Sequence, residues 1–127
     1  MQQPVEPYKI VLDADAKALR LTFNGFWDTE ILTSFQKDVE AATKKIRQRN
    51  RDFHTLIDQR LFGVQSAETA SGLTDVFDAN YKRQGGRVAI VIGGTLSKLQ
   101  IERHISTSRL KTFRNISDAC AWLEITC

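Results

Sequence analysis

The sequence predicts an α/β domain with a mixed, mostly parallel sheet of about five strands and about four helices. Two observations support this fold class. Two apolar segments near the N-terminal end have the two-residue period of strands. After them, short apolar segments alternate with longer segments of helical periodicity. Because right-handed crossovers return the chain in the same direction, the later strands should run parallel.

The first elements are a hairpin and a helix. The segments "YKIVLD" (8–13) and "ALRLTFNG" (18–25) flank the polar "ADAK", which is typical of two strands joined by a turn. Asp28 then caps a helix from Thr29 to about Arg47, where apolar residues recur at spacings of three and four. That apolar stripe can lie against one face of the sheet.

The rest of the chain alternates strand and helix, without repeats or linkers, as a single domain over residues 1–127. We expect the order β-β-α-β-α-β-α-β-α. The remaining elements are a strand at 52–58 ending on Asp58, a helix at 67–82, a buried strand at 87–92, a helix from Thr95 to about Ser108, a strand at 109–113, and the closing helix "ISDACAWLE" capped by Asn115 with Asp118 at its third position.

The composition, with 42% hydrophobic and 26% charged residues in 127, suits one globular domain. The longest apolar run, 88–92, is far shorter than the roughly 20 residues that cross a bilayer, and the first residues lack the features of a signal peptide. We therefore expect a cytoplasmic protein. Cys120 and Cys127 form no disulfide framework or metal-binding motif, so free thiols are expected.

Positive charge is concentrated in "KKIRQRNR" (44–51), which holds five of the 18 basic residues; the remainder has 13 basic and 15 acidic residues. Two interpretations stay open. The cations complement the negative end of a helix dipole in water, or they form a surface for anionic lipid headgroups or an acidic protein. No aromatic residues are interleaved, so nucleic acid is not expected as a partner. The basic residues are Lys44, Lys45, Arg47, Arg49 and Arg51.

Catalytic and metal-binding patterns are not found. The two histidines, His54 and His104, have no spacing typical of metal ligands, and no base stands near a nucleophile in sequence. We therefore predict a non-enzymatic protein without metal or cofactor. A small anion or ligand is the alternative to an ordinary turn at the carboxyl edge of the sheet. The candidates for that edge are Asp58, Arg60, Gly93, Gly94, Thr95 and Lys98.

Two further apolar features have open roles. In the helix expected at 95–108, Leu96 and Leu99 lie on a partly different face from Ile101 and Ile105. The broad apolar surface suits a homodimer, a protein partner or a lipid surface. Trp27, just after the second strand, is predicted to belong to the core because aromatic side chains usually bury most of their area.

The order of elements, the strand "HTLIDQR" and a serine eight residues after Asp58 at a helix start together resemble the STAS domain of sulfate transporters and anti-sigma factor antagonists. The resemblance spans nearly the whole chain. The segments "RLTFNGFWD", "VQSAE", "RVAIVI" and "FRNISDACAWL" are similar to the stand-alone bacterial SpoIIAA-like proteins, which are grouped with STAS and with CRAL-TRIO lipid-transfer domains. Most of those proteins have no assigned activity.

In signalling members of the family, a serine at the start of the second helix is phosphorylated by a partner kinase. Ser66 matches that serine, whereas Gln65 and Glu68 replace the aspartate and the glycine of the family's Asp-Ser-x-Gly pattern. The resemblance thus implies a phospho-switch or partner surface at Gln65, Ser66 and Glu68, with Asp58 nearby. The local alternative is that Ser66 is an ordinary helix N-cap.

The leading hypothesis is a protein-interaction or regulatory module, with another protein as partner. The alternative is an apolar or lipid ligand bound between the sheet and the helices, as the CRAL-TRIO kinship implies. The third is an enzyme that uses Asp58 or Ser66, which requires the two side chains to meet in one concave site.

Overall fold

A computed structural model describes residues 6–81, 85–93 and 109–127. Their strands form one five-stranded sheet in the order β1-β2-β3-β4-β5, in which β1 and β2 are antiparallel and the other neighbours are parallel. The predicted fold class, a mixed and mostly parallel α/β sheet, is confirmed. The strands are β1 (Tyr8–Leu12), β2 (Ala18–Gly25), β3 (His54–Phe62), β4 (Val88–Ile92) and β5 (Leu110–Phe113).

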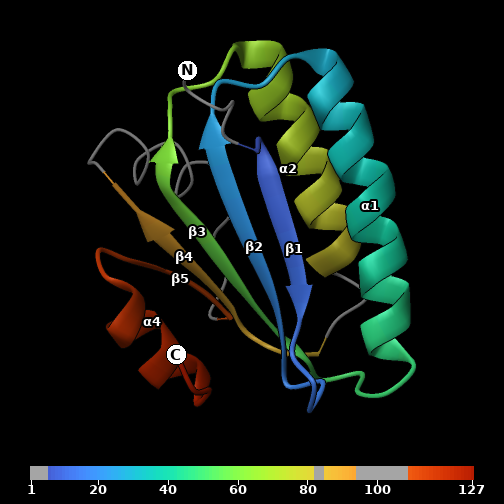
Figure 1. The fold of residues 1–127 in the computed structure, drawn as a ribbon, viewed down its shortest axis with the longest axis vertical. Helices are drawn as coiled ribbons and strands as arrows, with labels where there is room; N and C mark the ends of the chain where they lie inside the picture. Colours follow the sequence, from blue (N-terminus) through green and yellow to red (C-terminus); the bar gives the residue numbers. More distant parts are fainter. Residues whose placement is uncertain (1–5, 82–84, 94–108) are drawn as a thin grey trace.

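Three helices are described, and they lie on both sides of the sheet (Figure 1). The helices α1 (Thr29–Arg47) and α2 (Ala67–Tyr81) cover one face, and α4 (Ile116–Leu123) covers the other. The caps follow the prediction: the Asp28 carboxylate accepts the Ile31 N–H at 2.8 Å, and the Asn115 side chain accepts the Asp118 N–H at 2.9 Å. The helix expected from Thr95 to Ser108 lies outside the described residues.

The third strand is longer than predicted. It continues four residues beyond Asp58, to Phe62. Thr22 pairs with Asp58 but Asn24 pairs with Leu61, so β3 contains one extra residue, a β-bulge. The bulge lets the polar stretch after Asp58 stay in the sheet, and the prediction that the strand ends on Asp58 is wrong.

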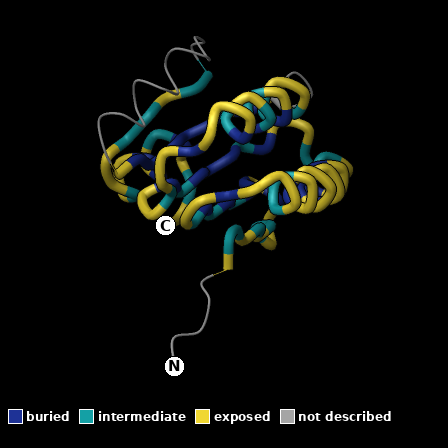
Figure 2. Tube along the Cα trace, turned by 90° about the horizontal axis from the view of Figure 1, so that it is seen from above, coloured by how far each residue is buried: buried dark blue, intermediate teal, exposed yellow. Residues whose placement is uncertain are grey.

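An aromatic cluster fills the core between the sheet and the helices α1 and α2. Trp27 is 1% exposed, which confirms its predicted place in the core, and its ring centroid lies 4.9 Å from that of Phe23 and 5.1 Å from that of Phe35. Figure 2 shows buried residues concentrated along the sheet and exposed residues on the outer sides of the helices. Since each buried aromatic side chain contributes about 3 kcal/mol, this cluster stabilises that face strongly.

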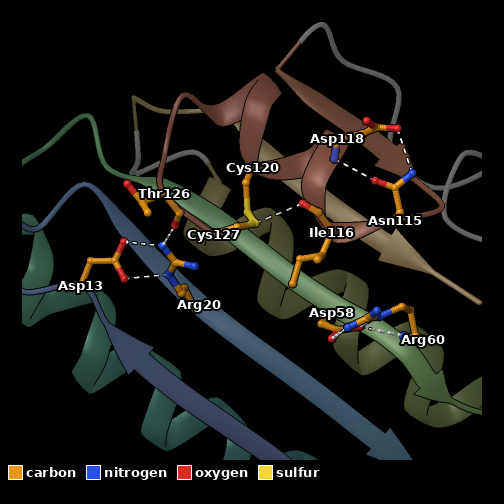
Figure 3. Close-up of a disulfide and its surroundings, with 10 residues drawn as sticks. All are labelled: Asp13, Arg20, Asp58, Arg60, Asn115, Ile116, Asp118, Cys120, Thr126 and Cys127. Atoms are coloured by element: carbon orange, nitrogen blue, oxygen red, sulfur yellow. Dashed lines mark hydrogen bonds and ion pairs between the residues drawn. A yellow bond between two sulfur atoms is a disulfide. The ribbon is translucent and has the colours of Figure 1, made fainter.

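On the opposite face, α4 packs on Leu56, Ala89 and Val91. Cys120 of this helix is bonded to Cys127 in a disulfide (Figure 3), so the prediction of free thiols is wrong. Glu124 adopts a left-handed conformation with φ 58°, which reverses the chain after the helix. The reversal brings the two cysteine Cα atoms to 5.8 Å, within the range that a disulfide spans.

The C-terminal residues are also tied to the hairpin. The Arg20 guanidinium donates to the Thr126 carbonyl oxygen and forms a two-point ion pair with Asp13, with an Nε–Oδ1 distance of 2.7 Å (Figure 3). The Asp13 partnership raises the pKa of Arg20. Residues more than a hundred positions apart in sequence are therefore joined on the α4 face.

Candidate functional site: the end of the sheet at the start of α2

The Ser66 hydroxyl caps α2. Its Oγ accepts the Thr69 N–H at 3.2 Å and donates to the Thr69 hydroxyl, which in turn donates to the Trp27 carbonyl oxygen. The Ser66 carbonyl accepts the Ala70 N–H at 2.9 Å, as the first bond of the helix. This geometry is that of an N-cap. Ser66 is nevertheless exposed, so its hydroxyl lies at the surface of the protein.

Gln65 has a different environment from the one expected for a partner-binding residue. Its side chain is 8% exposed, and all of its polar atoms are engaged. The Oε1 atom accepts the Trp27 N–H at 2.7 Å, while the Nε2 atom donates to the carbonyl oxygens of Gly25 and Gly63 at 3.0 and 2.6 Å. Gln65 thus joins the loop after β2 to the loop after β3, and its side chain does not form part of the outer surface.

Glu68 is exposed in the first turn of α2, where its negative charge complements the positive end of the helix dipole. Asp58 lies elsewhere. Leu56 packs on α4, and side chains two residues apart on a strand share a face, so Asp58 lies on the α4 side of the sheet. Because α2 covers the other face, the geometry does not bring Asp58 to the Ser66 hydroxyl.

The Asp58 carboxylate is paired with Arg60 on the same strand, with an Oδ2–Nη2 distance of 2.8 Å (Figure 3). Hydrogen bonds from the Arg60 side chain lower the pKa of Asp58, and the same pairing raises the pKa of Arg60. A general base needs a pKa near the working pH, whereas this carboxylate is held more acidic than usual.

Three apolar side chains that were not among the predicted site residues are exposed at this end of the sheet. Phe26 follows β2 and is 65% exposed; Leu61 is the second-to-last residue of β3 and is 74% exposed; Val64 follows β3 and is 58% exposed. We call these three residues the strand-end patch. In the sequence, this patch is indicated by the apolar residues of "GFW", at the end of β2 and after it, and of "LFGV", at the end of β3 and after it.

The strand-end patch is held together by backbone contacts. The Gly63 N–H donates to the Gly25 carbonyl at 3.0 Å, and both loops are bonded to the Gln65 amide. Phe26 and Val64 each lie between two of these bonded positions, and Leu61 stands next to β2 through its pairing with Asn24. Phe26 and Val64 therefore lie on adjacent, mutually fixed segments beside the start of α2. Leu61 is on the α4 side of the sheet, because its neighbour Phe62 packs into the core under α1 and α2.

The predicted basic surface lies apart from this patch. The basic residues Lys44, Lys45, Arg49 and Arg51 are exposed, and Arg47 is half-buried, at the opposite end of α1. Gly93 follows β4, whereas Gly94, Thr95 and Lys98 lie outside the described residues. The Nδ1 atom of His54 accepts the Arg87 N–H at 2.9 Å. Burial, and to a smaller extent the positive charge of Arg87, lowers the pKa of the His54 imidazole.

Between the sheet and the helices α1 and α2 is a mainly apolar cavity of about 40 Å³. Within residues 6–81, 85–93 and 109–127, no three acidic, histidine or cysteine side chains are grouped as a metal site would require. None of the helices in those ranges has the length and apolar character needed to cross a membrane.

Neither a known protein-family model nor a curated protein matches the sequence. Nine chains of solved structures match, and two of them are aligned with almost the whole chain. An uncharacterised protein of the DUF3478 family from Shewanella loihica PV-4, described as having a SpoIIAA-like fold, aligns with a TM-score of 0.72 and 20% identity over 97% of this chain and 98% of that protein. The NMR structure of the protein TM1081 aligns with a TM-score of 0.63 and 18% identity over 98% and 92% of the two chains. The fold is therefore SpoIIAA-like, as the sequence resemblance implied.

Proposed function

We propose that this chain is a non-enzymatic, STAS-like module that binds another protein through the strand-end patch and the exposed start of α2. The observation that carries the proposal is the exposure of Phe26, Leu61 and Val64 on segments fixed by hydrogen bonds. Apolar side chains gathered on a surface mark contact sites, and a rigid surface loses little conformational entropy when it binds.

Charge around the patch indicates the kind of partner. Asp28 and Glu30 at the start of α1 and Glu68 at the start of α2 are exposed within four residues of the patch in sequence. A partner that places apolar side chains on the patch and basic side chains beside it would match both properties. Ser66 adjoins this surface, so a phosphate on its hydroxyl would add negative charge where the partner binds.

Site-specific photocrosslinking tests the proposal. A photoreactive phenylalanine analogue is placed at position 26 or 64, and at exposed Gln36 on α1 as a control, in the organism that produces the protein. We expect a discrete adduct from positions 26 and 64, identified by mass spectrometry. Leu61→Ser should reduce its yield several-fold through the lost apolar contact, whereas Val11→Ser, which changes an exposed apolar residue on edge strand β1, should not.

Adducts that are equally abundant from all three positions, or absent from 26 and 64, would contradict the proposed surface. The switch is tested separately with Ser66→Asp, because aspartate is also a good N-cap and keeps the helix start intact. Equal adduct yields in this variant and the wild-type protein would exclude a charge-controlled switch while leaving the binding surface in place.

The alternative of a lipid between the sheet and the helices receives less support from the geometry. Pockets for small organic ligands commonly have volumes of about 300 Å³ or more, and the described cavity is about 40 Å³. A fatty acid would require α1 or α2 to separate from the sheet. Native mass spectrometry of the purified protein checks this, because a retained apolar ligand would favour the lipid hypothesis.

A further inference from the structure

A second surface feature lies at the carboxyl ends of β3 and β4, on residues that the strand-end patch does not use. It is a depression of about 310 Å³, lined among the described residues by Arg60, Ile92, Gly93 and Arg114. Open α/β sheets commonly bind ligands at the carboxyl ends of parallel strands. Two guanidinium groups that share one depression make it attractive to an anion.

Arg60 is held in position but keeps donors free. Its Nε and Nη2 atoms donate to the two oxygens of Asp58 at 3.0 and 2.8 Å, which fixes the plane of the guanidinium group. Of the five N–H groups of an arginine side chain, two are used in this way, and the other three have no partner among residues 6–81, 85–93 and 109–127. The side chain is 46% exposed, and these donors are accessible.

Arg114 brings the second charge from a different element. It lies between β5 and the Asn115 cap of α4 and is exposed, and it forms no ion pair within the described part of the chain. Asp58 is engaged with Arg60, and Asp118 is hydrogen-bonded to Asn115. Among the described residues, Arg60 therefore has an ion-pair partner and Arg114 has none.

The backbone fixes the distance between the strand ends. A Cβ atom on Gly93 would lie 2.6 Å from the Arg60 carbonyl oxygen, so only glycine permits this approach of β4 to β3. The backbones of Arg60 and Gly93 are thus in close contact at the depression that both residues line.

From this geometry we infer that Arg60 and Arg114 form a binding site for a phosphate group, either free or as a monoester. A phosphate presents several acceptor oxygens and two negative charges near neutral pH, which matches two guanidinium forks better than a single carboxylate does. The site uses no residue of the strand-end patch, and Arg60 directly precedes Leu61 in β3. Its ligand would be a small phosphorylated molecule or inorganic phosphate.

The test is a titration of the ¹⁵N-labelled protein with inorganic phosphate and, separately, with phosphoserine, followed by NMR at constant ionic strength. We expect saturable shifts of the Gly93 amide and of the Arg60 and Arg114 side-chain Nε–H signals. Arg114→Gln should weaken binding at least about fivefold, and Arg114→Lys, which keeps the charge without the fork, should weaken it less. Arg49→Gln, which removes an exposed arginine at the far end of α1, should leave binding unchanged.

The probe with the higher affinity, inorganic phosphate or phosphoserine, identifies the source of the phosphate group. The site is supported whichever of the two has the higher affinity. Unfolding midpoints are measured for every variant; if Arg60→Gln is unfolded because Asp58 loses its partner, the exposed Arg114 variants still decide the question. The inference is overturned if Arg114→Gln binds as tightly as the wild type, if acetate binds as tightly as phosphate, or if the shifts at Gly93 are no larger than those at Arg49 and Arg51.

Discussion

Replacing Gln65 by leucine tests whether this residue supports the site from within or contacts partners directly. The change removes the acceptor of the buried Trp27 N–H and the donors to the Gly25 and Gly63 carbonyls. Leaving one buried N–H unpaired costs about 1–3 kcal/mol, and each lost amide donor about 0.5–1.5 kcal/mol where water does not replace it. Gly25 keeps the Gly63 N–H as a donor, so the total should be about 2–4 kcal/mol.

The assay is urea unfolding followed by far-ultraviolet circular dichroism, with Gln36→Leu on the exposed side of α1 as the matched control. The control should change the free energy of unfolding by less than about 0.5 kcal/mol. Gln65→Glu separates the two roles of the amide, because its carboxylate still accepts the Trp27 N–H but faces two carbonyl oxygens without a proton to donate. A loss of less than about 0.5 kcal/mol in Gln65→Leu would refute the reasoning.

Three further predictions concern stability. Ser66→Ala should lower the free energy of unfolding by about 1 kcal/mol and Ser66→Asp should not, as measured by urea unfolding; equal stabilities of the two variants would contradict the cap. The pKa of His54 is lowered on folding, so the unfolded chain takes up this proton first and stability should fall as the pH drops below about 6.5. His54→Asn retains an acceptor for the Arg87 N–H without titrating, and its pH profile of thermal unfolding should be flatter over that range. Cys127→Ser should cost about 2–3 kcal/mol, given a sequence separation of 7, and an added reductant should then lower the stability of the wild type but not of this variant.

Local signals predicted most of the fold. Asp28 and Asn115 cap their helices because a short side-chain acceptor three residues before an N–H is a strong local preference, independent of distant packing. The five consecutive apolar residues of β4 likewise predicted an interior strand, and all five are buried. Such features depend on neighbours in sequence, so they are accessible without coordinates.

The missed features depend on contacts between distant segments. The polar residues after Asp58 read as a loop, but pairing with β2 and the bulge keep them in β3. The disulfide requires a left-handed residue at Glu124, where the sequence has no glycine to indicate a reversal. The resemblance placed Gln65 on a partner surface because it precedes Ser66, whereas hydrogen bonds to three backbone groups hold its side chain inside.

The position of Gln65 relates the fold to the proposed function. The STAS pattern that the sequence resembles has aspartate before the serine, and an ionised aspartate can accept hydrogen bonds but cannot donate to the carbonyls of Gly25 and Gly63. Glutamine can do both, so in this chain the residue before Ser66 fixes two loops to each other. That connection holds the segments that carry Phe26 and Val64 next to each other, whether or not a partner is present. A surface organised in this way favours binding through shape and apolar contact, with Ser66 at its margin as the place where a charge would modulate it.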